Sequence, residues 1–286
     1  MAVYKRVYKT YLGPRTDAWS RSYVLTRYSF ARLFQSRLLV LFLAACLFYP
    51  VGCLAFIYFS HNEQLLALLS LGNAKLPGID GKFFYTFCRF QGVLASLVAA
   101  VVGPGLVSPD IANGALALYF SRPFSRTQYV AGKLTTLTLL LSLITWVPGL
   151  LLYGTQAWLM GWEWTRANLW LGGAIVFGMV LWIVVLSLIA LALSAWVKWK
   201  IAASAFMLAI LYAGAGFGAV INNVLRTHYG GLLSLNQIIY TIWGELFRYD
   251  WGAQLGSSEA WAVLILGTAC CIWLLAKRIR PFEVVS

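Results

Sequence analysis

The polar side chains with the clearest chemistry lie between two long apolar stretches, in segment 109–133, which reads PDIANGALALYFSRPFSRTQYVAGK. Asp110 is placed to cap a short helix from Ile111 to about Phe120, and Pro123 interrupts the chain after it. The segment also carries five hydrogen-bond donors that we expect to face the cytoplasm: Ser121, Arg122, Ser125, Arg126 and Lys133. The chemistry predicted here is the docking of a partner protein, with the short helix as a rod that transmits force.

Bond-making chemistry has much weaker support in the sequence. The apolar stretches offer no cluster of His, Asp, Glu or Cys, so a membrane-embedded enzyme is disfavoured and we expect neither catalytic residues nor a metal site. The chain contains no Gly-x-x-x-x-Gly-Lys-Ser/Thr, because Gly132-Lys133 is followed by Leu134 and lacks the earlier glycine. We therefore expect no cofactor in this chain and an energy source in another polypeptide.

The elements that position this segment are apolar helices. Of the 286 residues, 61% are hydrophobic and 11% are charged, which fits a bilayer rather than water as the solvent. A helix needs about 20 apolar residues to cross the hydrocarbon core. Six stretches meet this requirement and predict an all-α polytopic membrane protein: 38–60, 84–108, 134–160, 169–196, 201–224 and 260–276.

The distribution of charge predicts the orientation of these spans. Sixteen of the 22 Lys and Arg and three of the nine Asp and Glu fall on the side of the termini, which gives that side +13 and the other side zero. By the positive-inside rule both termini are cytoplasmic in a multi-pass protein of the cytoplasmic (inner) membrane. Anionic lipid headgroups account for the positive charge, so we expect no nucleic acid as a partner.

The ends of the chain add one further element. Residues 1–37 form a basic cytoplasmic region in which 17–37 read as a helix capped by Asp17. Its aromatic side chains share one face opposite Arg21 and Arg32, which predicts an amphipathic helix lying flat on the inner leaflet. An ordinary helix packed on a partner is the alternative. Residues 277–286 form a cytoplasmic tail.

Two features inside the membrane domain 38–276 depart from plain spans. The outer connection 225–259 contains an apolar stretch, 232–247, that is long enough to dip into the membrane without crossing it, so we predict a re-entrant segment before the last span. Kinks are expected at Pro50 with Gly52 and at Pro148 with Gly149.

Glycines suggest two further roles. Gly103, Pro104 and Gly105 lie about one helical turn before the polar segment, where they form either a hinge or a static kink. Gly214 and Gly218 have the spacing that permits close approach within or between subunits.

Segment 109–133 resembles the ABC-2 family of transporter permeases. Members of that family carry an acid, a glycine, an apolar run, Ser-Arg-Pro, Ser-Arg and Gly-Lys in this order. This chain matches the order at Asp110, Gly114, Ser121-Arg122-Pro123, Ser125-Arg126 and Gly132-Lys133. It departs from the family where relatives commonly have Glu-Arg and this chain has Asp110-Ile111.

The resemblance implies a prokaryotic permease subunit that dimerises with a second copy or a paralogue. Separate ABC ATP-binding subunits would hold the ATP and Mg²⁺ and dock on the loop as a coupling helix. Because the spans contain almost no charge, a lipid-like, amphipathic or polymeric cargo is expected, and export is the usual direction in the family.

Two other readings remain open. The chain is alternatively a non-transporting scaffold that passes ATPase motion to a periplasmic accessory protein. The cations of the loop are alternatively ordinary positive-inside charges. The sequence does not identify substrate-binding residues.

Overall fold

A computed structural model describes residues 18–62, 77–121, 125–227, 229–252 and 255–278. These residues form helices and no strand. Six of the helical segments are long and apolar enough to cross a membrane, which confirms the six predicted stretches and the all-α class. They are α2 (Arg37–Ser60), α4–α5 (Gly81–Val102 and Pro104–Ala112), α7–α8 (Arg126–Ile144 and Trp146–Met160), α10 (Leu169–Trp196), α11–η1–α12 (Lys200–Leu208, Ala209–Ala213 and Gly214–Leu225) and α14 (Ser257–Arg278).

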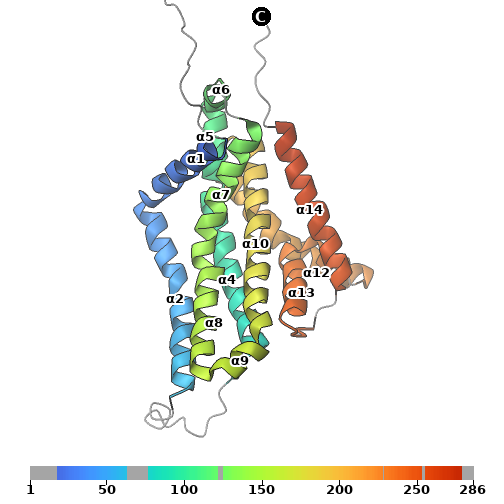
Figure 1. The fold of residues 1–286 in the computed structure, drawn as a ribbon. Helices are drawn as coiled ribbons and strands as arrows, with labels where there is room; N and C mark the ends of the chain where they lie inside the picture. Colours follow the sequence, from blue (N-terminus) through green and yellow to red (C-terminus); the bar gives the residue numbers. More distant parts are fainter. Residues whose placement is uncertain (1–17, 63–76, 122–124, 228, 253–254, 279–286) are drawn as a thin grey trace, which may run out of the picture.

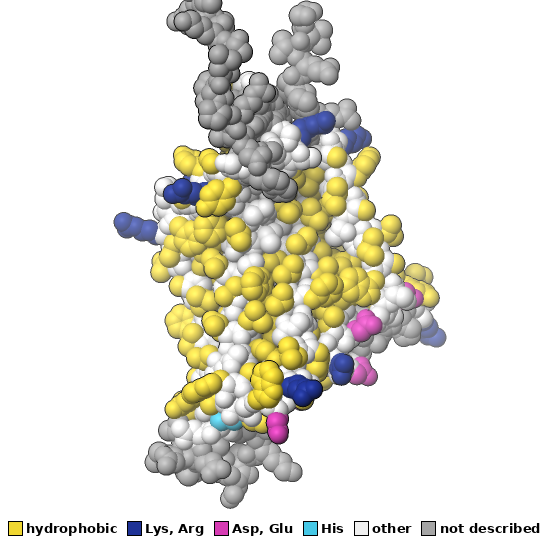
Figure 2. All heavy atoms as spheres, in the orientation of Figure 1, with side chains coloured by type: hydrophobic (Ala, Val, Ile, Leu, Met, Phe, Trp, Pro, Cys, Tyr) yellow, Lys and Arg dark blue, Asp and Glu magenta, His cyan; other side chains and the backbone are white. Residues whose placement is uncertain are grey.

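The first described helix and the C-terminal end of the last lie at the same end of the bundle. Helix α1 (Ala18–Phe34), helix α6 (Ala115–Phe120) and the C-terminal end of α14 lie at the end drawn uppermost in Figure 1, called the upper end below. Helix α9 (Trp162–Ala167) lies at the opposite, lower end. Between the two ends, hydrophobic side chains cover most of the face seen in Figure 2, and its Asp and Glu gather in the lower half. This layout suits an even number of membrane crossings.

Helix α10 occupies the centre of the bundle (Figure 1). It packs against α4, α5, α7, α8 and α14, and its side chains Trp182 and Ile183 are almost completely buried. Its sequence is apolar on every face, as expected of a helix surrounded by other helices. The indole N–H of Trp182 donates to the carbonyl of Gly92 at 3.0 Å, so even this polar atom is satisfied inside the core.

The predicted proline kinks have different outcomes. Helix α2 continues through Pro50, whereas α7 ends at Ile144 and α8 begins at Trp146, just before Pro148. A proline lacks the N–H that would bond the carbonyl four residues earlier, so Pro50 releases Cys46 and Pro148 releases Ile144. The side-chain amide of the fully buried Gln91, from α4, donates to both of these carbonyls. One glutamine thus satisfies the backbone groups that two prolines leave open.

Replacing Gln91 with leucine should lower the free energy of unfolding by about 2 kcal/mol, because two carbonyls in the apolar interior lose their donor. Equilibrium unfolding in mixed micelles measures the change. The matched control is Gln156→Leu on α8: Gln156 is also buried and, like Gln91, has an Oε1 without a partner among the described residues, but its side-chain amide donates to none of their carbonyls. Equal losses in the two variants would contradict the role assigned to Gln91.

Helix α1 packs along α7. Thr26 of α1 is buried, and its hydroxyl lies 3.1 Å from the carbonyl of Gly132 on α7. A Cβ on Gly132 would lie only 2.9 Å from Leu25, so the two helices are in close contact there. Tyr23 and Phe34 belong to the predicted aromatic face and are exposed beside the packing face. Asp17, the predicted cap, and the side chains of Trp19 and Arg21 lie outside the described residues. The helix is therefore present, and its lying on a membrane surface stays a prediction.

The connection before the last span, predicted to be re-entrant, folds into two short elements. They are a 3₁₀ turn, η2 (Tyr229–Leu233), and α13 (Leu235–Leu246). The 12 residues of α13 rise about 18 Å, which is less than the ~30 Å hydrocarbon core. Figure 1 draws α13 between α10 and α14, and Ile239, Ile242 and Trp243 are fully buried there. Re-entry into the membrane remains a prediction.

Candidate functional site

The polar segment does not fold as predicted at Asp110. Asp110 lies in the last turn of α5, and the next helix, α6, begins only at Ala115. Gly114 has φ +67°, a left-handed conformation that favours glycine and ends α5. The prediction that Asp110 caps a helix starting at Ile111 is therefore wrong, because the carboxylate has a stronger partner elsewhere.

That partner is Lys133, on α7. Its ammonium lies 2.9 Å from Asp110 Oδ2, and the hydroxyl of Tyr129 donates to the same oxygen at 2.7 Å. The Lys133 side chain is only 8% exposed and the Asp110 side chain 18%, so the pair is shielded from solvent. A buried ion pair is stable only when both members are present. The prediction that Lys133 is a donor facing the cytoplasm is therefore wrong. Lys133 instead links α5 to α7 inside the bundle.

The remaining loop residues cap a helix, are exposed, or lie outside the described residues. Ser125 caps α7, since its hydroxyl accepts from the N–H of Gln128 and its own N–H donates to Gln128 Oε1. Ser121 is exposed and its hydroxyl lies 2.9 Å from the carbonyl of Leu118. Arg126 is exposed in the first turn of α7, where it can reach a partner. Arg122 and Pro123 lie outside the described residues.

The Gly103–Gly105 break is braced by α10. A Cβ on Gly103 would collide with the Cβ of Ala190, so only glycine allows this approach. One turn further, Ser108 N–H donates to Ser194 Oγ at 2.7 Å, and Ser108 Oγ lies 3.0 Å from the Ser194 carbonyl. The serine pair ties α5 to α10 beside the break. A hinge here would have to carry α10 with it, and the hinge role stays a prediction.

Gly214 and Gly218 allow a close approach within this chain. A Cβ on Gly214 would collide with the carbonyl oxygen of Leu233, and a Cβ on Gly218 with that of Gly230. The neighbour is thus the backbone of η2 rather than a second long helix. The spacing predicted close packing but did not reveal its partner.

No protein-family model matches this chain, and no curated protein matches it. Its functional interpretation therefore depends on its own residues and on the likeness of segment 109–133 to the ABC-2 pattern.

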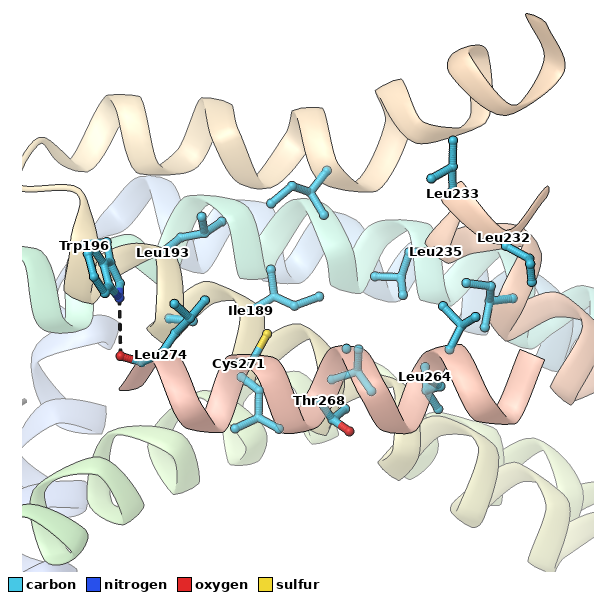
Figure 3. Close-up of a pocket in the computed structure, with 17 residues that line it drawn as sticks. Ile189, Leu193, Trp196, Leu232, Leu233, Leu235, Leu264, Thr268, Cys271 and Leu274 are labelled. Atoms are coloured by element: carbon cyan, nitrogen blue, oxygen red, sulfur yellow. Dashed lines mark hydrogen bonds between the residues drawn. The ribbon is translucent and has the colours of Figure 1, made fainter. Parts of the chain in front are cut away.

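An apolar groove runs along the side of the bundle (Figure 3). It has a volume of about 460 Å³, and its walls come from α10, α13, α14, η1 and η2. Figure 3 shows Ile189 and Leu193 facing Leu264 and Cys271 across it. At one end, Trp196 Nε1 donates to the carbonyl of Leu274 at 3.3 Å. Such a surface suits hydrocarbon and offers little to a polar ligand.

Arg89, the one charge clearly inside the predicted spans, is held by aromatic rings. The centre of its guanidinium lies 4.4 Å from the ring of Tyr240, 5.7 Å from that of Tyr85 and 5.8 Å from that of Trp251. Cation–π contacts of this kind stabilise a cation where water is scarce. The rings come from α4, from α13 and from the segment after α13, so Arg89 links the connection before the last span to the bundle.

The polar segment is tied to its neighbours by the ion pair between α5 and α7 and by the serine bonds between α5 and α10. Among the side chains that the structure describes, no three His, Cys, Asp or Glu lie close enough to hold a metal ion. Sequence reasoning missed Tyr129, Ser108 and Ser194, which fix the polar segment to α7 and α10. The available signal was weak: each is a polar residue within or next to an apolar run.

Proposed function

We propose that this chain is the membrane-spanning permease subunit of an ABC-2 type transporter, driven by separate ATP-binding subunits. The observation that carries the proposal is the arrangement of the upper end. Helix α6 stands at the tip of the second span, and the Asp110–Lys133 pair joins that span to the third. A push on α6 therefore acts on two spans together. In this proposal the upper end faces the cytoplasm of a prokaryotic cell, and both termini are cytoplasmic.

The ion pair and the serine pair define the proposed path of force. Closure of two ATPases on ATP moves α6, and the movement passes through Asp110 to α7 and through Ser108 to α10. Two copies of the chain, or this chain and a paralogue, form the pathway between them. ATP and Mg²⁺ stay in the partner subunits.

The groove supports a lipid-like, amphipathic or polymeric cargo with long apolar parts. Its lining is almost entirely aliphatic, and Thr268 and Trp196 are the exceptions with polar atoms. A small ion would lose its hydration there without replacement ligands. Export is the proposed direction.

The test of the docking surface is Arg126→Glu. In this variant co-purification of the ATP-binding subunit should fall at least about tenfold, because the exposed cation at the start of α7 becomes an anion facing the partner. The chain itself should stay folded, since an exposed charge contributes little to stability. Quantitative pull-down from native membranes measures the effect, and Arg122→Glu extends it to the neighbouring position.

The matched control is Lys198→Glu, which makes the same charge change at an exposed residue of the loop between α10 and α11. Equal recovery of the ATPase with Arg126→Glu and Lys198→Glu would remove the proposed docking role. Reconstituted vesicles then distinguish an exporter from a non-transporting scaffold. ATP-dependent movement of lipid supports the exporter. ATP hydrolysis without flux supports a scaffold that moves a periplasmic protein.

A further inference from the structure

A second cavity, separate from the apolar groove, opens at the upper end beneath α1. Its volume is about 350 Å³, and it is lined by residues of α1, α2, α4, α5, α6, α7 and α11. Unlike the groove, it combines charged and hydroxyl-bearing side chains with aliphatic ones. The cavity therefore has the mixed character expected of a site for an amphipathic molecule.

The cavity carries a net positive charge. Arg32, Lys133 and Lys200 line it together with one carboxylate, Asp110, so three cations against one anion leave a formal charge of +2. Lys133 is paired with Asp110. Among the described residues neither Arg32 nor Lys200 pairs with a carboxylate, and these two side chains remain available to an anion.

Lys200 is an exposed residue whose side chain lies over Gly105. A Cβ on Gly105 would lie 3.3 Å from Lys200 Cε and 3.5 Å from its Nζ, so the lysine stem runs directly over Gly105. Arg32 projects into the cavity from α1, and the hydroxyl-bearing Ser29 and Ser36 line it as well. Cations and hydroxyls from separate helices thus line one cavity, and charged donors of this kind bind phosphate oxygens.

The opposite wall of the cavity is aliphatic. Leu39, Val102 and Leu106 are buried there, whereas Val101 is 51% exposed on the outside of the bundle. Leu38 and Leu41, next to the cavity on α2, are also exposed. Exposed apolar side chains of α2 and α4 therefore adjoin the cavity, and α2 runs from there toward the lower end, along the direction that an acyl chain takes in a bilayer.

We propose that this cavity binds the phosphate headgroup of an anionic phospholipid, with Arg32 and Lys200 as its cationic contacts. The lipid's acyl chains lie along Val101 and the exposed face of α2. The headgroup bridges α1 to α5 and α11, so the bound lipid fixes the amino-terminal helix against the bundle. Free inorganic phosphate has the same anionic chemistry but lacks the acyl chains, and the aliphatic wall favours the lipid.

The test uses the full-length chain purified in detergent and titrated with dioleoyl phosphatidylglycerol, with dioleoyl phosphatidylcholine and with inorganic phosphate. Native mass spectrometry counts the lipids retained. The chain should bind a single phosphatidylglycerol molecule, and more tightly than phosphatidylcholine. In the double variant Arg32→Gln/Lys200→Gln the affinity for phosphatidylglycerol should fall about thirtyfold. The single variant Lys200→Gln should weaken it about fivefold and serves if the double variant does not fold.

The matched control is Lys198→Gln/Lys277→Gln, which removes two exposed cations that do not line the cavity. Phosphatidylglycerol binding to this control should be unchanged. An equal loss in the control would overturn the site, since the attraction would then be general surface charge. Equal affinity for phosphatidylcholine, or saturation by inorganic phosphate at the same concentration, would also overturn it.

Discussion

Replacing Lys133 with methionine is expected to lower the free energy of unfolding by about 3 kcal/mol, because the shielded carboxylate of Asp110 loses its cation. Asp110→Asn should cost about as much, since the Lys133 ammonium then faces a neutral amide. The double variant Asp110→Asn/Lys133→Met should recover most of the loss, because no unpaired charge remains and Tyr129 can still donate to the Asn oxygen. Equilibrium unfolding of the four proteins measures a coupling energy of about 2 kcal/mol or more.

The control for this cycle is Lys198→Met, which removes an exposed lysine and should change stability by less than about 0.5 kcal/mol. Strict additivity of the two single losses in the double variant would show that Asp110 and Lys133 do not act as a pair. In an ATPase-coupled complex the single variants should also uncouple ATP hydrolysis from cargo movement, since α5 and α7 lose their link.

Gly218→Ala should be similarly damaging, with a loss of about 2 to 3 kcal/mol in the free energy of unfolding. The new methyl group would collide with the carbonyl oxygen of Gly230, and a backbone atom cannot rotate away as a side chain does. The η2 segment must then move off α12. Equilibrium unfolding measures the loss, and faster hydrogen exchange at residues 229–233 locates it.

The control lies two residues away on the same helix. A Cβ on Gly216 meets nothing within 4 Å, so Gly216→Ala should instead stabilise the protein by about 0.5 to 1 kcal/mol through higher helix propensity. Opposite signs at the two positions are the expected result. A loss at Gly216 as large as at Gly218 would mean that helix geometry, rather than contact with η2, is responsible.

The six spans could be predicted because the bilayer imposes a simple requirement on each of them. A run of about 20 apolar residues is visible in the sequence without knowledge of any neighbour. The breaks near Gly103 and Pro148 were also visible, because proline acts on its own helix. At Pro50 the helix α2 is not interrupted, although Gln91 donates to the released carbonyl there as it does at the Pro148 break.

The functional segment was predictable in composition but not in its contacts. Asp110 reads locally as a helix cap, and Lys133 reads as a solvent-facing cation. Their pairing depends on how α5 and α7 align, which local sequence does not determine. Gly214 and Gly218 show the same limit, because their spacing predicted a close neighbour and only the folded chain identifies η2 as that neighbour.

The central position of α10 divides the spans into two groups with different freedom to move. In their most apolar windows, 67% of the second span and 61% of the fourth are buried within the chain, against 17% of the fifth and of the sixth. Tightly packed elements resist gradual deformation, so the second to fourth spans should move as one body. The fifth and sixth spans line parts of the apolar groove, and α14 packs on α10, α13 and η2 rather than on α5 or α7. Widening the groove by displacing α14 therefore leaves the ion pair and the serine bonds undisturbed.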